Sequence, residues 1–89
     1  MQTRFEQFIR ERKYVTNVSP KTLLWYRDSF KHLSTPDPTE TELKDFVVRL
    51  RERGLKASSV NAYARAVNAY LHWCGSPLRI SKLKEPQLT

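Results

Sequence analysis

Residues 58–75 read SSVNAYARAVNAYLHWCG and contain the clearest helical pattern of the chain. Apolar side chains recur there every three or four residues, which is the period of one face of an α-helix. This stripe consists of Val60, Tyr63, Ala64, Val67, Leu71 and Cys74. Two serines precede the stripe and a glycine follows it, as is typical of helix starts and ends. The stretch therefore predicts a helix that begins near Ser58-Ser59, ends at Cys74-Gly75 and buries the stripe.

Two further helices are predicted over residues 3–14 and 39–54, each from a capping-box spacing at its start. The capping pairs are Thr3 with Glu6 and Thr39 with Glu42. The apolar stripes are Phe5, Phe8 and Ile9 in the first helix, and Leu43, Phe46, Val47 and Leu50 in the second. Gly54 ends the second helix, because a glycine readily adopts the left-handed conformation that follows a helix.

Between these two, Ser19-Pro20 predicts another helix start, since serine caps a helix and proline suits its first position. Its stripe consists of Leu23, Tyr26, Phe30 and Leu33, and the two prolines of residues 34–38 end it. Residues 76–89 contain two prolines and no helical period, which indicates an irregular tail. No segment alternates as a strand does, so we expect an all-α, compact four-helix bundle over residues 1–75 and a linker over 76–89.

The composition excludes several classes of protein. The chain has 89 residues with a formal net charge of +7, and its hydrophobic share of 39% is too high for a disordered segment. No apolar run approaches the roughly 20 residues of a membrane span. One cysteine and two histidines provide neither an internal disulfide nor a zinc cluster, so we expect no metal or other cofactor. The excess of cations favours nucleic acid or another anionic partner.

The helix predicted over residues 58–75 also carries a polar stripe, which we expect to point away from the core. It consists of Asn61, Arg65, Asn68 and His72, and the small residues Ala62, Ala66 and Ala69 lie between them. Amide and guanidinium groups suit bidentate contacts with base edges, and small neighbours let a helix enter a major groove. Ser58 and Ser59 add hydroxyl and N–H groups for a phosphate. The alternative is that this face binds nothing and is only solvated, and that the alanines are present because alanine favours the helical conformation.

The helix that begins at Ser19-Pro20 has a second polar face. Its members are Lys21, Thr22, Trp25, Ser29 and His32. Trp25 is expected either to stack on a sugar or base, with Lys21 beside it on the phosphate backbone, or to wedge at the edge of the core. The second arrangement is common, because tryptophan is rarely fully buried.

A basic cluster precedes the last predicted helix. It consists of Arg49, Arg51, Arg53 and Lys56. Cations near a helix C-terminus are favourable for dipole reasons alone, so a solvated cluster is the simpler interpretation. Arg53 and Lys56 nevertheless lead directly into the last helix, where they can clamp a phosphate.

Catalysis within this chain is not expected. Cys74 lies on an apolar stripe, and a buried thiol without a cationic neighbour is inert. Neither His32 nor His72 has a carboxylate nearby in the sequence, and no glycine-rich phosphate loop is present.

Several of these segments resemble the core-binding domain of tyrosine recombinases, the integrases of phages and transposons. Residues 19–26, SPKTLLWY, resemble the S-x-x-T-x-x-x-Y entry to a helix of that domain. Residues 55–74 resemble its last long helix, which runs from small hydroxylated residues through Asn to an aromatic end. The acidic, threonine-capped helix over 39–54 lies in the expected place between them, and residues 80–86 resemble the linker to the catalytic domain. The resemblance covers essentially the whole chain.

The resemblance implies a SAM-like helical bundle that grips one face of a duplex recombination half-site, while a separate catalytic domain closes on the other. It also implies that the second and fourth helices approach the major groove. Together with Lys56, the candidate DNA-binding residues are Lys21, Thr22, Trp25, Ser29, Ser58, Ser59, Asn61, Ala62, Arg65 and Asn68. Trp25 departs from the family, in which a smaller or polar residue is common at that place.

The family's chemistry requires a tyrosine nucleophile and an H-x-x-R motif, yet neither His32 nor His72 is followed by an arginine three residues later. The chain is therefore expected to be a non-catalytic domain of a longer integrase. Expected partners are double-stranded DNA, the catalytic domain of the same polypeptide and other recombinase protomers on DNA. The expected location is the cytoplasm, at the nucleoid when bound to DNA, and no membrane partner is expected. The alternatives are a protein–protein module, with Trp25 or Trp73 marking a partner groove, and an RNA-binding helical domain.

Overall fold

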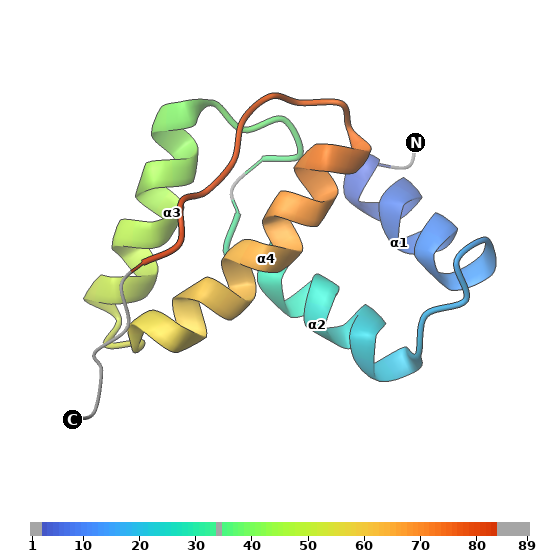
Figure 1. Ribbon diagram of the computed structural model, residues 1–89, viewed down its shortest axis with the longest axis horizontal. Coiled ribbons are helices and arrows are strands. Elements are labelled where there is room, and N and C mark those ends of the chain that lie inside the picture. Colours follow the sequence, from blue (N-terminus) through green and yellow to red (C-terminus); the bar gives the residue numbers. More distant parts are fainter. Residues whose placement is uncertain (1–2, 34, 84–89) are drawn as a thin grey trace.

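Four α-helices account for the regular secondary structure of residues 3–33 and 35–83, which are the residues that the computed structural model describes (Figure 1). The helices are α1 (Arg4–Tyr14), α2 (Pro20–Phe30), α3 (Glu40–Glu52) and α4 (Ala57–Trp73). The all-α fold and all four predicted helices are confirmed. The last helix begins one residue earlier than predicted, at Ala57.

The predicted capping residues explain where three of the helices begin. The hydroxyls of Thr3 and Ser19 each accept a hydrogen bond from a first-turn N–H of α1 and α2. Thr39 and Glu42 form the full capping box of α3, with each side chain bonded to the other residue's backbone N–H. The fourth helix differs, because Lys56 occupies its cap position without a side-chain hydrogen bond.

The two glycines end α3 and α4 as predicted. Gly54 has a φ of 91° and Gly75 a φ of 75°, which lie in the region that favours glycine. The chain therefore changes direction directly after α3 and after α4. A short connection leads from α3 into α4.

The core forms around α4, which packs against each of the other helices and most extensively against α2. Aromatic rings fill its centre: the Phe8 ring lies edge-on to the rings of Tyr26 and Tyr70, with centroids 5.0 and 5.6 Å apart. The predicted stripes supply most of the buried side chains, including Phe8, Phe46 and Val67. Tyr70 and Ala66 are also fully buried, although the stripe predicted for α4 contained neither.

Residues 76–83, here called the strap, return along α4. In Figure 1 the strap is drawn in red and lies between α3 and α4, running opposite to α4. It has no regular secondary structure, as predicted, but it is not a free linker, since Ile80 is only 9% exposed and Leu78 and Leu83 pack against the core. Residues 84–89 of the predicted tail lie outside the described residues.

Within residues 3–33 and 35–83, no helix combines the length and the apolar character that crossing a membrane requires.

Candidate nucleic-acid interface

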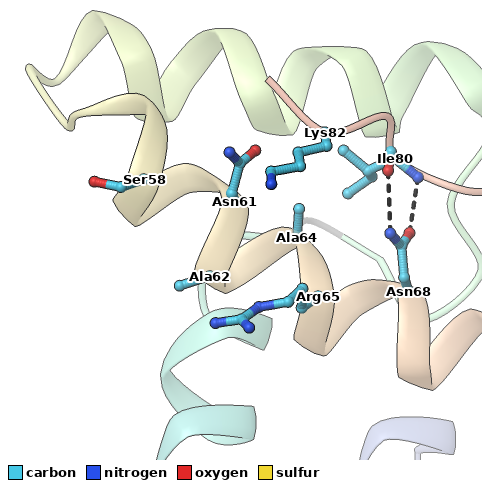
Figure 2. A pocket seen from close by; sticks show the side chains of 8 residues that line it. All are labelled: Ser58, Asn61, Ala62, Ala64, Arg65, Asn68, Ile80 and Lys82. Atoms are coloured by element: carbon cyan, nitrogen blue, oxygen red, sulfur yellow. Dashed lines mark hydrogen bonds between the residues drawn. The ribbon is translucent and has the colours of Figure 1, made fainter. Parts of the chain in front are cut away.

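A hollow of about 240 Å³ lies beside α4, at the edge of the strap (Figure 2). Its lining residues are Ser58, Asn61, Ala62, Ala64, Arg65, Asn68, Ile80 and Lys82. Five of these, all on α4, are candidate DNA-binding residues from the sequence. The structure therefore brings most of the predicted α4 contacts together at one place, and adds two residues of the strap.

The charge of this hollow is entirely positive. Of the residues that the structure describes, Arg65 and Lys82 are the charged ones in its lining, and no described carboxylate lines it. Among the described residues, the ion pairs are Lys31 with Asp28 and Lys44 with Glu40, so neither cation of the hollow is neutralised by a carboxylate. Both side chains are exposed. The hollow therefore presents to solvent two cations that no described carboxylate pairs with, and it attracts anions.

The position of Arg65 follows from helix geometry. Successive residues of an α-helix turn by about 100°, so Asn61, Arg65 and Asn68 lie within about 60° of one another. Asn61 and Asn68 lie nearer to the buried side of α4, marked by Ala64, while Arg65 lies toward the open side. The predicted stripe thus exists as a row of polar residues, but only part of it is open to solvent.

The two asparagines have a different environment from the one predicted. Asn68 donates from Nδ2 to the carbonyl of Ile80 at 3.0 Å and accepts at Oδ1 from the Ile80 N–H at 2.7 Å. Asn61 makes the same pair of bonds with Leu83, at 3.0 and 2.8 Å, and is 8% exposed. The expectation that both amides point freely outward is wrong, because the strap covers them and takes up their hydrogen bonds.

The face of α2 that the sequence predicted is also only partly exposed. Ser29 is fully buried and donates from its hydroxyl to the carbonyl of Trp25 at 2.8 Å, so its predicted outward placement is wrong. Trp25 is half-buried against the core, its ring centroid 5.0 Å from that of Tyr26. Lys21 is exposed, and Thr22 is half-buried with its hydroxyl 3.0 Å from that of Ser19. No residue of α2 lines the hollow.

The alanines predicted to lower the surface of α4 are not equivalent. Ala66 is fully buried in the core, which corrects its predicted position on the outer face. Ala62 and Ala69 are half-buried, and Ala62 lines the hollow. Ser58 and Ser59 are exposed in the first turn of α4, whose N–H groups no side chain caps.

The basic cluster at the end of α3 makes contacts within the protein. Arg49 donates to the carbonyl of His32 at 3.1 Å, and the guanidinium of Arg53 lies 3.4 Å from Nδ1 of the same residue. Partial burial, together with the charges of Arg53 and Arg49, lowers the pKa of His32 below its ordinary value. Arg51 donates to the carbonyl of Leu55 at 3.2 Å. Three of the four cations thus join the end of α3 to neighbouring segments, while Lys56 stays exposed.

Sequence reasoning missed Lys82 and Ile80 as parts of the site. The signal available was the seven-residue spacing of two asparagines on α4, combined with the apolar residues Leu78, Ile80 and Leu83 in residues 76–83. That signal indicates a covered helix face only if the tail is assumed to fold back, and nothing local in the sequence requires this.

No metal site is evident in this region: within ranges 3–33 and 35–83, no three His, Cys, Asp or Glu side chains gather closely enough to hold an ion. No protein-family model, curated protein or solved structure matches the chain.

Proposed function

We propose that the chain is the non-catalytic, core-binding domain of a tyrosine site-specific recombinase, and that the open side of α4 contacts duplex DNA. The observation that supports this most is the hollow at Arg65 and Lys82, in which two exposed cations lie together and no carboxylate of the described residues lines the wall. Phosphate oxygens are the ligands that such a set prefers, and phosphate contacts supply most of the affinity in protein–DNA complexes.

The chemistry of the α4 face suits a DNA backbone and a groove edge. The guanidinium of Arg65 presents paired N–H donors that match two phosphate oxygens or the O6 and N7 atoms of guanine. Ala62 beside it is small, so the duplex can approach the helix closely. Ser58 and Ser59 lie in the first turn, where uncapped N–H groups and the helix dipole favour a phosphate.

The proposed contact set therefore differs from the one derived from the sequence. Direct contacts are assigned to Arg65, Lys82, Ser58, Ser59, Ala62 and Lys56, with Lys21 and Thr22 of α2 as a second set. Asn61 and Asn68 act through the strap. In the full recombinase, a catalytic domain follows the strap and other protomers bind neighbouring half-sites. The domain needs no cofactor and acts on DNA in the cytoplasm.

A salt titration of DNA binding tests this function. If the domain neutralises about four to six phosphates, log K falls against log salt with a slope of roughly −4 to −5. We expect Arg65→Gln to weaken binding by about tenfold, since a bidentate contact is worth on the order of 1–3 kcal/mol. Arg10→Gln, which removes an exposed charge from α1, is the matched control and should change affinity little. Binding that does not depend on salt, or equal losses in the two variants, would contradict the proposal.

A protein–protein module is the second candidate, and one observation favours it. A mainly apolar hollow of about 430 Å³ lies between α3 and the strap, where Val48 is 50% exposed beside Leu43, Val47 and Leu83. The tryptophans do not support this function, because both Trp25 and Trp73 pack against the core. A co-elution of the chain with a protein partner, without binding to duplex DNA, would favour this candidate. Preference for single-stranded or hairpin RNA would instead favour an RNA-binding domain.

A further inference from the structure

The strap follows α4 in a defined register. Asn68 pairs with the backbone of Ile80 and Asn61 with that of Leu83, each through one donated and one accepted hydrogen bond. Seven residues of α-helix rise about 10.5 Å, and three residues of extended chain cover about 10 Å. The two spacings match, so the asparagines hold the strap antiparallel to α4 at two points.

This register decides which side chains of the strap face α4. Ile80 and Lys82 line the hollow beside α4. Arg79, Ser81 and Leu83 line, with Ile80, the hollow beside α3. A shift of the strap by one residue would therefore bring Ser81 or Leu83, both uncharged, to the position that Lys82 occupies beside α4.

The register thereby places a second cation next to Arg65. Figure 2 shows Lys82 extending from the strap and Arg65 from α4 around the same hollow, while the hydroxyl of Ser58, at the start of the helix, points away from both. Two like charges that share a hollow repel each other, and a bound anion relieves this repulsion. A guanidinium and an ammonium from different segments can also hold different oxygens of one phosphate group.

We infer that Arg65 and Lys82 form a phosphate-binding site that exists only while Asn61 and Asn68 hold the strap in this register. The inference rests on the proposed function for the identity of the ligand, which is a phosphodiester of the DNA backbone. The two asparagines are thus positioning residues, and they contribute to DNA binding through Lys82 rather than through base edges.

An exchange of two neighbouring residues tests the site without changing the net charge. Ser81→Lys combined with Lys82→Ser moves the ammonium to the α3 side of the strap, and both residues are exposed, so the fold is preserved. Affinity for a short DNA duplex is measured by fluorescence anisotropy at several salt concentrations. We expect the exchange and Lys82→Gln to weaken binding alike, by about five- to tenfold at about 0.1 M salt, with the salt slope reduced by about one.

Lys13→Gln is the matched control, since it removes one exposed charge from α1. It should change affinity by no more than about twofold, because surface charges remote from a site act only through the screened field. The inference is wrong if the exchange variant binds DNA as tightly as the unmodified chain, or if Lys82→Gln loses no more affinity than Lys13→Gln.

The positioning role has a readout of its own. In the unmodified chain, the N–H groups of Ile80 and Leu83 should be protected from hydrogen exchange, because each donates to an asparagine oxygen. Asn68→Leu keeps a side chain of similar size without hydrogen bonds. In this variant the Ile80 N–H should no longer be protected from hydrogen exchange. Adding Lys82→Gln to Asn68→Leu should then cause no further loss of DNA affinity. If Lys82→Gln weakens DNA binding as much in Asn68→Leu as in the unmodified chain, the inference is wrong. If Asn68→Leu does not fold, as judged by circular dichroism, Asn61→Leu makes the same test at the other point.

Failure of the proposed function gives a different result from failure of this inference. If the unmodified chain does not bind duplex DNA, the proposed function is wrong, and the site is tested with inorganic pyrophosphate. A saturable NMR shift of the Arg65 guanidinium N–H, lost in the exchange variant, supports the phosphate site. No saturable shift, or the same shift in the exchange variant, overturns it.

Discussion

The hydroxyl of Tyr70 in α4 donates a hydrogen bond to the carbonyl of Pro36 in the connection between α2 and α3. The two residues are 34 positions apart, and Tyr70 is fully buried. Burial, together with the neighbouring Cys74 thiol, raises the pKa of the Tyr70 hydroxyl, which therefore keeps its proton and remains a donor at neutral pH. This bond fastens the irregular connection to the helix around which the core forms.

We expect Tyr70→Phe to lower the free energy of unfolding by about 1–2 kcal/mol, because the ring stays while a buried hydrogen bond is lost. Urea unfolding followed by circular dichroism measures the change. Tyr63→Phe is the control, since Tyr63 is half-buried on the same helix and no hydrogen bond of its hydroxyl is recorded among the described residues. Equal effects of the two variants would show that the bond to Pro36 does not stabilise the fold.

Stability should fall on acidification through the protonation of His32. The pKa of His32 is lowered in the folded protein by partial burial and by Arg53 and Arg49, with Asp28 acting in the opposite direction. The unfolded chain therefore binds the proton more readily, so the stabilisation is complete above the ordinary pKa of 6.5 and is lost as the pH falls below it.

His32→Gln should reduce this part of the pH dependence, measured as the difference in unfolding free energy between neutral and mildly acidic buffer. His72→Gln is the matched control, because that ring is exposed at the far end of α4. A His32→Gln protein with the same pH dependence as the unmodified chain would contradict the assignment.

The capping box of α3 gives a prediction that depends only on local structure. Thr39→Ala removes the hydroxyl that accepts from the Glu42 N–H at 3.2 Å, and should destabilise the protein by about 1 kcal/mol. Thr41→Ala, two residues later on an exposed position, should change stability by less than about 0.5 kcal/mol. Thermal unfolding of both variants makes the comparison, and a larger effect of Thr41→Ala would be inconsistent with the cap.

The packing of the strap gives a fourth prediction. Ile80 is buried in the groove between α3 and α4, so Ile80→Ala should cost about 2 kcal/mol and increase hydrogen exchange at Leu83. Leu24→Ala, at a position that is 61% exposed, should cost much less. If Ile80→Ala leaves both the stability and the exchange at Leu83 unchanged, the strap does not contribute to the core.

The elements of this fold were predictable because their signals are local. Capping pairs such as Thr39 with Glu42 lie within one helical turn, and the apolar period of each helix can be read from a window of about a dozen residues. Glycines with positive φ followed α3 and α4 at the expected places. Helix number, most helix ends and most buried faces therefore agree with the structure, although α2 ends at Phe30, three residues before the last residue of its predicted stripe, Leu33.

The burial of α4 was underestimated for a physical reason. A helix with one apolar stripe is expected to bury one face, yet α4 packs against all three other helices and the strap. Tyr70 and Ala66 lie outside the predicted stripe and are nevertheless fully buried. Ser29 is buried as well, because its hydroxyl finds a partner within its own helix and needs no solvent.

By itself, the sequence determined four helices, their caps, their inward stripes and a row of polar residues on the last helix. Only the tertiary structure decided what that row does. Asn61 and Asn68 bond to residues 22 and 12 positions away, and no local pattern specifies which distant backbone a side-chain amide will meet. Through these bonds the strap returns to α4, and Lys82 comes to lie beside Arg65 on the face that we propose for DNA.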